Sequence, residues 1–278
     1  MATRRILCLS DTHPGSIDGM LPPDFVTSTG HHVKQNIGQS YLWECFLDMV
    51  KWATAKPLDA IVIVGDVVEG KQPKSRCAEL CLPLMRDQEN ASKVIFRTLF
   101  SAAKCSKIFF VKGTFYHDDE MGRSVDNIAE ELKSTAYEGL GVGTYAKEVL
   151  DLDVDGCVLD FSHGISVSGG LYRAVAIDRE ALWSALAGKT GQAPKADVVV
   201  RGHAHYFVHI EHPSKHGIIL PAWQLQTSYM RKNSRYRMLP DLGAVILEID
   251  GSAKKRNEDP CRVIKRLYPL PTHRLTHL

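Results

Sequence analysis

Long apolar segments are absent from this chain of 278 residues. No run approaches the roughly 20 apolar residues that a helix needs to cross a bilayer, so a membrane-spanning protein is excluded. The apolar run Ile6–Leu9 is too short for the core of a secretory signal, and we interpret it as a strand. Internal repeats, low-complexity tracts and evident linkers are also missing. We therefore expect one domain over residues 1–278.

Neither the cysteines nor the net charge of the chain indicates a particular function. Cys77 and Cys81 are four residues apart, but the further Cys or His residues of a zinc site are not near them. The chain has seven cysteines, and Cys8 and Cys157 lie in apolar runs, which indicates reduced thiols and a cytoplasmic location. A formal net charge of +2 neither demands nor excludes a nucleic-acid partner. Functional signals must therefore come from local motifs.

Four short apolar runs between residues 5 and 200 each end in a polar motif. They are rich in Ile and Val and punctuated by Gly, which is typical of buried strands. The runs and motifs are Arg5–Leu9 before Ser10-Asp11-Thr12-His13, Ala60–Val64 before Gly65-Asp66, Ile108–Val111 before Gly113-Thr114, and Ala196–Val200 before Gly202-His203-Ala204-His205. Helix-like segments at about 39–55 and 88–104 separate the first three runs. This alternation predicts a largely parallel sheet, with the motifs together beyond the carboxyl ends of its strands.

The second half of the chain is richer in strand-like segments. One helix is expected at about 172–187, and strands are expected at 142–152, 157–161, 207–211, 217–220, 244–249 and 263–268. Many late strands with few helices suggest a second sheet packed on the first. The predicted class is α/β, with two packed sheets flanked by helices.

The motifs combine carboxylates and imidazoles. Asp11 and His13 are two residues apart at a strand end, and Asp66 follows a glycine that permits a tight turn. Further imidazoles come from His163 and the His203/His205 pair. Such mixed ligands suit Mn, Fe, Zn, Co or Ni better than Ca or Mg, which favour oxygen alone.

In this order the motifs resemble the calcineurin-like metallophosphoesterases. The signatures of that family are D-x-H, G-D-x-x-x-G, G-N-H-[DE], an isolated His and G-H-x-H, and the resemblance covers residues 10–205. The third block departs from the pattern, because this chain has Gly113-Thr114-Phe115-Tyr116-His117-Asp118. It is most similar to a phage and prophage branch with G-T-x-Y-H at that place. The resemblance implies an αββα sandwich of two packed mixed β-sheets.

The resemblance also implies two divalent transition-metal ions, with Mn as the first choice. Asp11, His13 and His205 would hold one ion, His163 and His203 the other, and Asp66 would bridge them. Thr114 stands where the family has a metal-binding Asn, and is the candidate for its place. A hydroxide shared by the ions would attack the phosphate ester in line.

Two further roles come from the same resemblance. His117 would stabilise the transferring phosphoryl group or protonate the leaving oxygen, and Asp118 would orient the His117 imidazole. The activity would be hydrolysis of phosphodiesters, in nucleic acid or cyclic nucleotides, within a bacterium or phage-infected host. Basic segments at 231–237 and 254–256 favour that substrate. The alternatives are a phosphomonoesterase acting on a metabolite or phosphoprotein, and a scaffold that has lost a metal.

Some residues outside the motifs have two interpretations. The turn Ser166–Arg173 enters a helix, so Arg173 is either a phosphate contact or part of a plain loop. Tyr116 and Trp223 either stack on a base or belong to the core. The remaining histidines match no motif and are expected at the surface: His31, His32, His209, His212, His216, His273 and His277. The sequence does not predict an oligomeric state.

Overall fold

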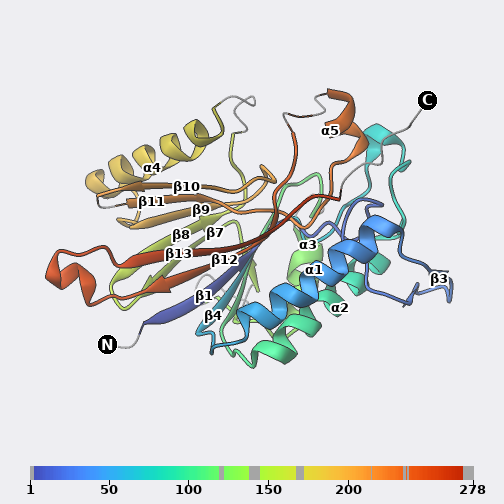
Figure 1. Ribbon diagram of the computed structural model, residues 1–278, viewed down its shortest axis with the longest axis horizontal. Helices are drawn as coiled ribbons and strands as arrows, with labels where there is room; N and C mark the ends of the chain where they lie inside the picture. Colours follow the sequence, from blue (N-terminus) through green and yellow to red (C-terminus); the bar gives the residue numbers. More distant parts are fainter. Residues whose placement is uncertain are drawn as a thin grey trace.

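Two β-sheets lie face to face, and helices cover their outer faces, in the computed structural model (Figure 1). The model describes residues 3–118, 122–137, 145–166, 172–213, 215–233, 236 and 238–271, apart from the side chains of residues 74 and 233. The expected α/β class with two packed mixed sheets and flanking helices is confirmed. The expectation of one domain stays a prediction.

The first sheet has six strands, of which β12 runs antiparallel to the other five. In spatial order they are β13 (Cys261–Tyr268), β12 (Leu242–Ile249), β1 (Arg4–Leu9), β4 (Ala60–Val64), β5 (Ile108–Val111) and β6 (Ala146–Lys147). On its outer face lie α1 (Ile37–Ala53), α2 (Met85–Ala103) and α3 (Arg123–Glu131). The parallel strands β1, β4 and β5 carry three of the predicted motifs at their carboxyl ends.

The second sheet has five strands, of which β8, β9 and β11 are parallel. In spatial order they are β10 (Val208–His212), β11 (Lys215–Ile219), β9 (Val198–Arg201), β8 (Cys157–Ser162) and β7 (Val149–Val154). Its outer face is covered by α4 (Arg173–Thr190). Smaller elements are β2 (Phe25–Val26), β3 (His32–Val33), α5 (Ser228–Asn233) and the 3₁₀ turns Pro73–Ser75 and Ala253–Arg256.

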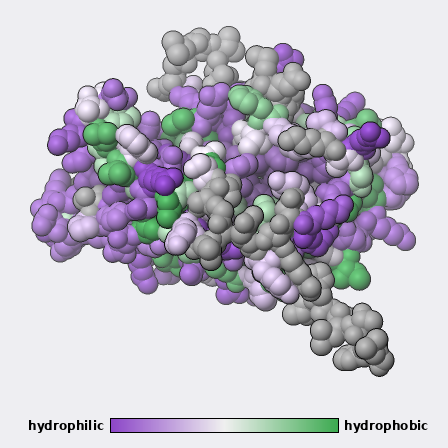
Figure 2. Space-filling model, turned by 90° about the horizontal axis from the view of Figure 1, so that it is seen from above, coloured by the Kyte–Doolittle hydropathy of each residue, from purple (hydrophilic) through white to green (hydrophobic). Residues whose placement is uncertain are grey.

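The central strands are apolar throughout because both of their faces are buried. Along β1, Leu7 and Leu9 pack under the helices, whereas Ile6 and Cys8 pack against the second sheet. Alternate side chains of a strand point to opposite faces, so a strand between two layers has no polar face. Figure 2 shows one outer face of the molecule, on which hydrophilic residues predominate and apolar side chains form small separate groups.

The start of α1 follows from its capping residues. Asn36 Oδ1 accepts a hydrogen bond from the Gln39 main-chain N–H, and Gln39 Oε1 accepts one from the Asn36 N–H. This reciprocal pair satisfies two N–H groups that have no partner inside the helix. The helix therefore starts at Ile37, two residues before the predicted position.

One expectation about the late strands is wrong. The last two strands, β12 and β13, join the first sheet rather than the second, and β12 pairs directly with β1. The side chains of β12 alternate between the two hydrophobic cores, and a strand that is apolar on both faces can occupy the middle of a sheet. The short helices α3 and α5 were not expected. Among the described helices, none has both the length and the apolar character required to cross a bilayer.

Candidate metal centre

Five strand ends meet at one edge of the sandwich. The parallel strands β1, β4 and β5 supply Asp11, His13, Asp66 and the Gly113–Asp118 segment, and the parallel strands β8 and β9 of the facing sheet supply the remaining histidines. The loops are tied to one another by main-chain hydrogen bonds, including Asp11 N–H to the Gly65 carbonyl (3.1 Å) and His13 N–H to the Asp66 carbonyl (3.2 Å).

One group of possible ligands consists of Asp11, His13 and His205, whose donor atoms lie within 4.8 Å of one another. His205 Nε2 is 3.1 Å from Asp11 Oδ1 and 3.2 Å from His13 Nε2. These are the residues that the resemblance assigns to the first metal.

A second group consists of Asp66, His163 and His203, again with donor atoms within 4.8 Å. His163 Nε2 lies 3.0 Å from Asp66 Oδ2 and 3.7 Å from Asp11 Oδ1, and His13 Nε2 lies 3.8 Å from Asp66 Oδ2. The two groups are therefore adjacent, and Asp66 is near both. The structure brings all six residues together; their roles as ligands stay a prediction.

The protein hydrogen-bonds one polar atom of each of three side chains, Asp11, Asp66 and His163, and leaves the opposite atom without a well-aligned hydrogen bond. Such a set of atoms fits a cation. Asp11 Oδ2 accepts the His203 N–H (3.1 Å), Asp66 Oδ1 accepts the Thr114 N–H (2.7 Å), and His163 Nδ1 lies 2.8 Å from the Val64 carbonyl. The opposite atoms, Asp11 Oδ1, Asp66 Oδ2 and His163 Nε2, are buried without a well-aligned hydrogen bond. Unpartnered buried polar atoms are rare, and a divalent cation would satisfy these three.

Backbone strain is concentrated at the same residues. Five of the six candidate ligands have left-handed φ values, between 44° and 67°: Asp11, His13, Asp66, His203 and His205. A non-glycine residue in this region costs about 1–2 kcal/mol, so such residues persist where the surrounding structure holds them. The strained positions therefore coincide with the candidate ligands.

Glycines of the motifs permit the close approach of these loops. A Cβ atom on Gly113 would overlap the Asp66 main-chain nitrogen and the Asp118 carboxylate, and one on Gly65 would overlap the His163 ring. A Cβ on Gly202 would collide with the Ser10 hydroxyl. The glycines therefore let backbone from both sheets lie directly behind the ligands.

Both central carboxylates are ionised at neutral pH. Burial acts to raise the pKa of Asp11, but His205 and His163 lower it well below the ordinary value. Burial likewise acts to raise the pKa of Asp66, and His163 and His117 outweigh it. Burial acts to lower the pKa of His163, but Asp66 and Asp11 raise it to about 10, so the carboxylates attract positive charge, which a bound cation can supply in place of the imidazolium protons.

Glu69 is a site residue that the sequence interpretation missed. Its carboxylate is buried, and Oε2 lies 2.9 Å from His13 Nδ1. Gln72 and Gln224 hold the carboxylate through hydrogen bonds of 2.6 and 3.0 Å. The main-chain carbonyl of Glu69 contacts His117 Nδ1 at 2.6 Å. An acidic residue inside the Gly65–Gly70 motif was the available signal, because a ligating His needs a partner for its second nitrogen.

Asp118 has a different position from the one predicted for it. Its carboxylate accepts main-chain N–H groups of Asp66 (3.2 Å), Val67 (3.1 Å) and Gly113, and the carbonyl of Glu69 takes the expected place beside His117. The turn that begins at Thr114 accounts for this, since it directs the Asp118 side chain under the Asp66 loop. Burial, with the charge of Asp66, raises the pKa of Asp118 to about 7.

Thr114 and His117 lie beside Asp66. The Thr114 hydroxyl donates to Asp66 Oδ1 at 3.1 Å, so it supports the carboxylate predicted to bridge the metals. A ring nitrogen of His117 lies within 4.8 Å of donor atoms of His13 and Asp66. This geometry is compatible with His117 either as an acid at the leaving oxygen or as a ligand in the place of the missing Asn.

The outer candidates have separate surroundings. The Arg173 guanidinium lies 4.7 Å from the centre of the Tyr206 ring and 3.8 Å from Asp241, and its predicted phosphate contact stays a prediction. Residues 167–171 of the Gly-rich turn lie outside the described residues. The Tyr116 ring is 4.9 Å from that of His117 and partly exposed. Trp223 is fully buried against Phe46, so the interpretation of Trp223 as a core residue is confirmed.

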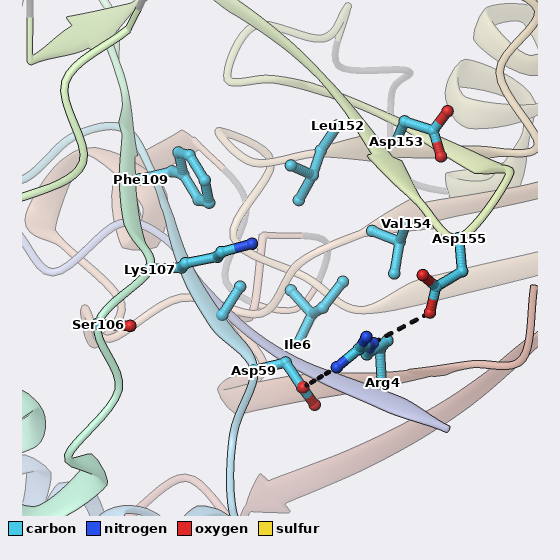
Figure 3. Close-up of a pocket in the computed structure, with 11 residues that line it drawn as sticks. Arg4, Ile6, Asp59, Ser106, Lys107, Phe109, Leu152, Asp153, Val154 and Asp155 are labelled. Carbon is cyan, nitrogen blue, oxygen red and sulfur yellow. Dashed lines mark hydrogen bonds and ion pairs between the residues drawn. The ribbon is translucent and has the colours of Figure 1, made fainter. Parts of the chain in front are cut away.

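A pocket of ≈ 240 Å³ lies at the opposite end of the strands (Figure 3). Arg4 at its rim bonds Asp59 and Asp155, each at 3.0 Å. Its lining includes Lys107, Phe109 and Leu152, and none of the candidate metal ligands. The chemistry-bearing side chains are therefore elsewhere.

Comparisons with known proteins leave the family open. No protein-family model and no curated protein match this chain. Among solved structures, Vps29 from Cryptosporidium parvum is 10% identical, with 96% of this chain and 99% of that chain covered and a TM-score of 0.43. Vps29 from Entamoeba histolytica in complex with zinc is 15% identical, with 94% and 98% covered and a TM-score of 0.40. A novel archaeal phosphodiesterase is 13% identical, with 94% and 99% covered and a TM-score of 0.41. Similarities this weak assign neither a family nor an activity.

Proposed function

We propose that this chain is a phosphoesterase whose catalytic centre holds two divalent transition-metal ions. The observation that carries the proposal is the arrangement of Asp11 and Asp66. Each buried carboxylate has one oxygen fixed by main-chain N–H groups, while the other lies unbonded among imidazoles. A pair of dications would satisfy these two oxygens and the imidazole nitrogens that face them at 3.0–3.1 Å, whereas a merely structural cluster would satisfy them with well-aligned hydrogen bonds.

The two groups of donor atoms supply the ligands. Asp11, His13 and His205 would hold one ion, and His163 and His203 the other, with Asp66 between them. Mixed imidazole and carboxylate donors favour Mn, with Fe, Zn, Co and Ni as alternatives. Cations held there supply Lewis acidity, which activates water and neutralises charge on the phosphoryl oxygens.

His117 is the proposed general acid. The Glu69 carbonyl, 2.6 Å from Nδ1, fixes the ring and leaves Nε2 as the atom that can carry a proton to the leaving oxygen. Glu69 also holds His13 through its carboxylate, so one residue positions both a ligand and the acid. The alternative role of His117 as a metal ligand rests on its closeness to His13 and Asp66.

The proposed substrate is a phosphodiester, in nucleic acid or a cyclic nucleotide. Phe115 and Tyr116 precede His117 and have exposed rings, which suit stacking on bases. Arg231 and Lys232 on α5 are exposed cations, suited to phosphate contacts. Phosphomonoesters of a metabolite or phosphoprotein are the alternative. Residues 235 and 237 of the basic segment lie outside the described residues.

A substrate panel with Mn²⁺ tests the proposal. It should contain nitrophenyl mono- and diesters, cyclic nucleotides, and single- and double-stranded DNA and RNA. We expect diester hydrolysis and about two equivalents of metal per chain. Faster hydrolysis of monoesters than of diesters would identify the protein as a phosphomonoesterase instead. Absence of turnover, with one metal or none bound, would instead identify a scaffold.

A further inference from the structure

A second set of metal-binding side chains lies on the edge of the five-stranded sheet, outside the proposed catalytic centre. His209, Glu211 and His216 have donor atoms within 4.8 Å of one another. Sequence motifs gave no reason to group them, and the expectation that His216 is a surface residue is wrong, since only 3% of it is exposed. His209 is half-buried, whereas Glu211 is exposed.

Strand pairing produces this grouping. In the antiparallel ladder of β10 and β11, Glu211 lies directly opposite His216. His209 is two residues before Glu211 and therefore points to the same face of the sheet. His209 Nε2 is 3.0 Å from His216 Nδ1, which is a hydrogen-bond contact. A cation would replace the shared proton, and the nitrogens would move apart to the separation of about 3.3 Å that two ligands of one tetrahedral Zn²⁺ have. The three side chains are held by regular strands, which fixes their spacing.

Asp259 completes the arrangement from outside it. Both of its carboxylate oxygens lie 2.9 Å from His216 Nε2. With the Nε2 proton donated to Asp259, His216 Nδ1 has a lone pair directed toward His209. A carboxylate behind the imidazole is the usual support of a metal-binding His, because it fixes the tautomer and increases the basicity of the ligating nitrogen.

We propose that His209, Glu211 and His216 form a third divalent-cation site, structural in role and suited to Zn²⁺. The ligating atoms are His209 Nε2, His216 Nδ1 and a Glu211 carboxylate oxygen, with water in the remaining position. Exposure of Glu211 gives the ion an entry path. This site is independent of the proposed hydrolytic function.

The position of the site explains what an ion would do there. Strand β10 is the edge of the second sheet and β13 is the edge of the first. Asp259 lies just before β13, and it also accepts the Cys261 N–H at 2.9 Å. A cation on the β10–β11 pair would therefore link the edges of both sheets through His216 and Asp259, and would resist their separation.

Zn²⁺ titration of the Mn²⁺-loaded protein, against a chromophoric chelator, tests the site. Wild type should be compared with Glu211→Gln and His209→Gln, with His212→Gln as the matched control. His212 is on the same strand but bonds Asp178 at 2.9 Å, outside the cluster. We expect the first two variants to bind about one equivalent less than wild type and the control to bind the same amount. Any replacement of Mn²⁺ by Zn²⁺ at the proposed catalytic centre would occur equally in all four proteins and would not affect the difference between them.

Thermal unfolding with and without Zn²⁺ gives a second measurement. Zn²⁺ should raise the Tm of wild type and of His212→Gln more than that of the other two variants, because it binds the folded state. Glu211→Gln replaces an exposed side chain and should fold and hydrolyse a model ester as wild type does. Equal Zn²⁺ binding by all four proteins would overturn the site, as would an equal loss in His212→Gln. Loss of hydrolysis with Zn²⁺ binding intact would count against the other centre only.

Discussion

The two ends of the sandwich are built from the same strands and differ in how their charges are satisfied. At the amino ends, Arg4 is paired with Asp59 and Asp155, and a pocket lies beside them. At the carboxyl ends, Asp11 and Asp66 are buried among histidines, and each has an oxygen without a well-aligned hydrogen bond. Five of the six candidate ligands at that end have left-handed φ values.

If the proposed centre is the catalytic one, buried polar atoms without a well-aligned hydrogen bond locate it better than open volume does. Paired, half-exposed charges lower each other's energy and need nothing further. Buried carboxylates and imidazoles held by strained turns keep a binding capacity that the fold does not use. If this distinction is right, substitutions at the carboxyl ends should change metal binding and activity, whereas substitutions at the amino ends should change neither.

Asp66→Asn should have the largest effect. A neutral amide bridges two dications poorly, so metal-dependent turnover should fall by at least about 10³-fold and both metals should bind more weakly. Steady-state kinetics and metal analysis of the purified protein check this. Wild-type turnover with full metal occupancy would remove Asp66 from the bridging role.

His117→Ala should be next in size. If His117 protonates the leaving oxygen, kcat should fall about 10²–10⁴-fold on esters with poor leaving groups and much less on nitrophenyl esters. The metal content should be unchanged. A mild effect on every substrate would exclude the acid role, and loss of a metal would show that His117 is a ligand.

Glu69→Gln should weaken the centre through His13 without removing a ligand. The amide keeps the shape but lacks the charge that faces His13 Nδ1, so metal affinity should fall about 10–100-fold. Excess Mn²⁺ should restore most of the activity. Competition with a chelator measures the change, and Gln72→Ala, which removes only a neighbouring donor to Glu69, should give a smaller effect in the same direction.

Much of this centre could be predicted from the sequence, because strand ends and motif order place Asp11, His13, Asp66, His203 and His205 at one edge. Local pattern specified those positions. It could not specify Glu69 as the partner of His13, because that contact depends on how the loop after Asp66 packs against the loop after His13. It could not specify the contacts of Asp118 either, because they depend on how the turn at Thr114 folds.

The sheet assignment of the late strands and the His209–Glu211–His216 group were beyond local pattern for a related reason. Strand β12 buries residues on both faces, so its sequence alone suits either sheet. The histidine group depends on the register that pairs Glu211 with His216 across β10 and β11. Which strands pair, and in which register, is determined by tertiary structure and cannot be predicted from the periodicity of a single strand.

Thr114→Asn should have a smaller effect at the carboxyl ends, and of opposite sign. Under limiting chelator, one metal should leave wild type before the other, since a hydroxyl bonded to Asp66 replaces the amide ligand implied by the family resemblance. An amide oxygen at 114 should tighten the metal that leaves first by up to about tenfold. Simultaneous loss of both metals, unaffected by the substitution, would contradict the expected inequality of the sites.

Asp155→Ala, at the amino ends, should have the smallest effect on function. Asp155 contacts Arg4 at 3.0 Å, and Arg4 keeps its second partner Asp59 when this contact is lost. Both members are substantially exposed, so solvent replaces most of the interaction. We expect kcat/KM within about twofold of wild type, an unchanged metal content and a small decrease in Tm. The same assays used for Asp66→Asn check this. A loss of metal or a large loss of activity in Asp155→Ala would mean that the two ends are coupled through the strands, and that unsatisfied donors alone do not delimit the functional centre.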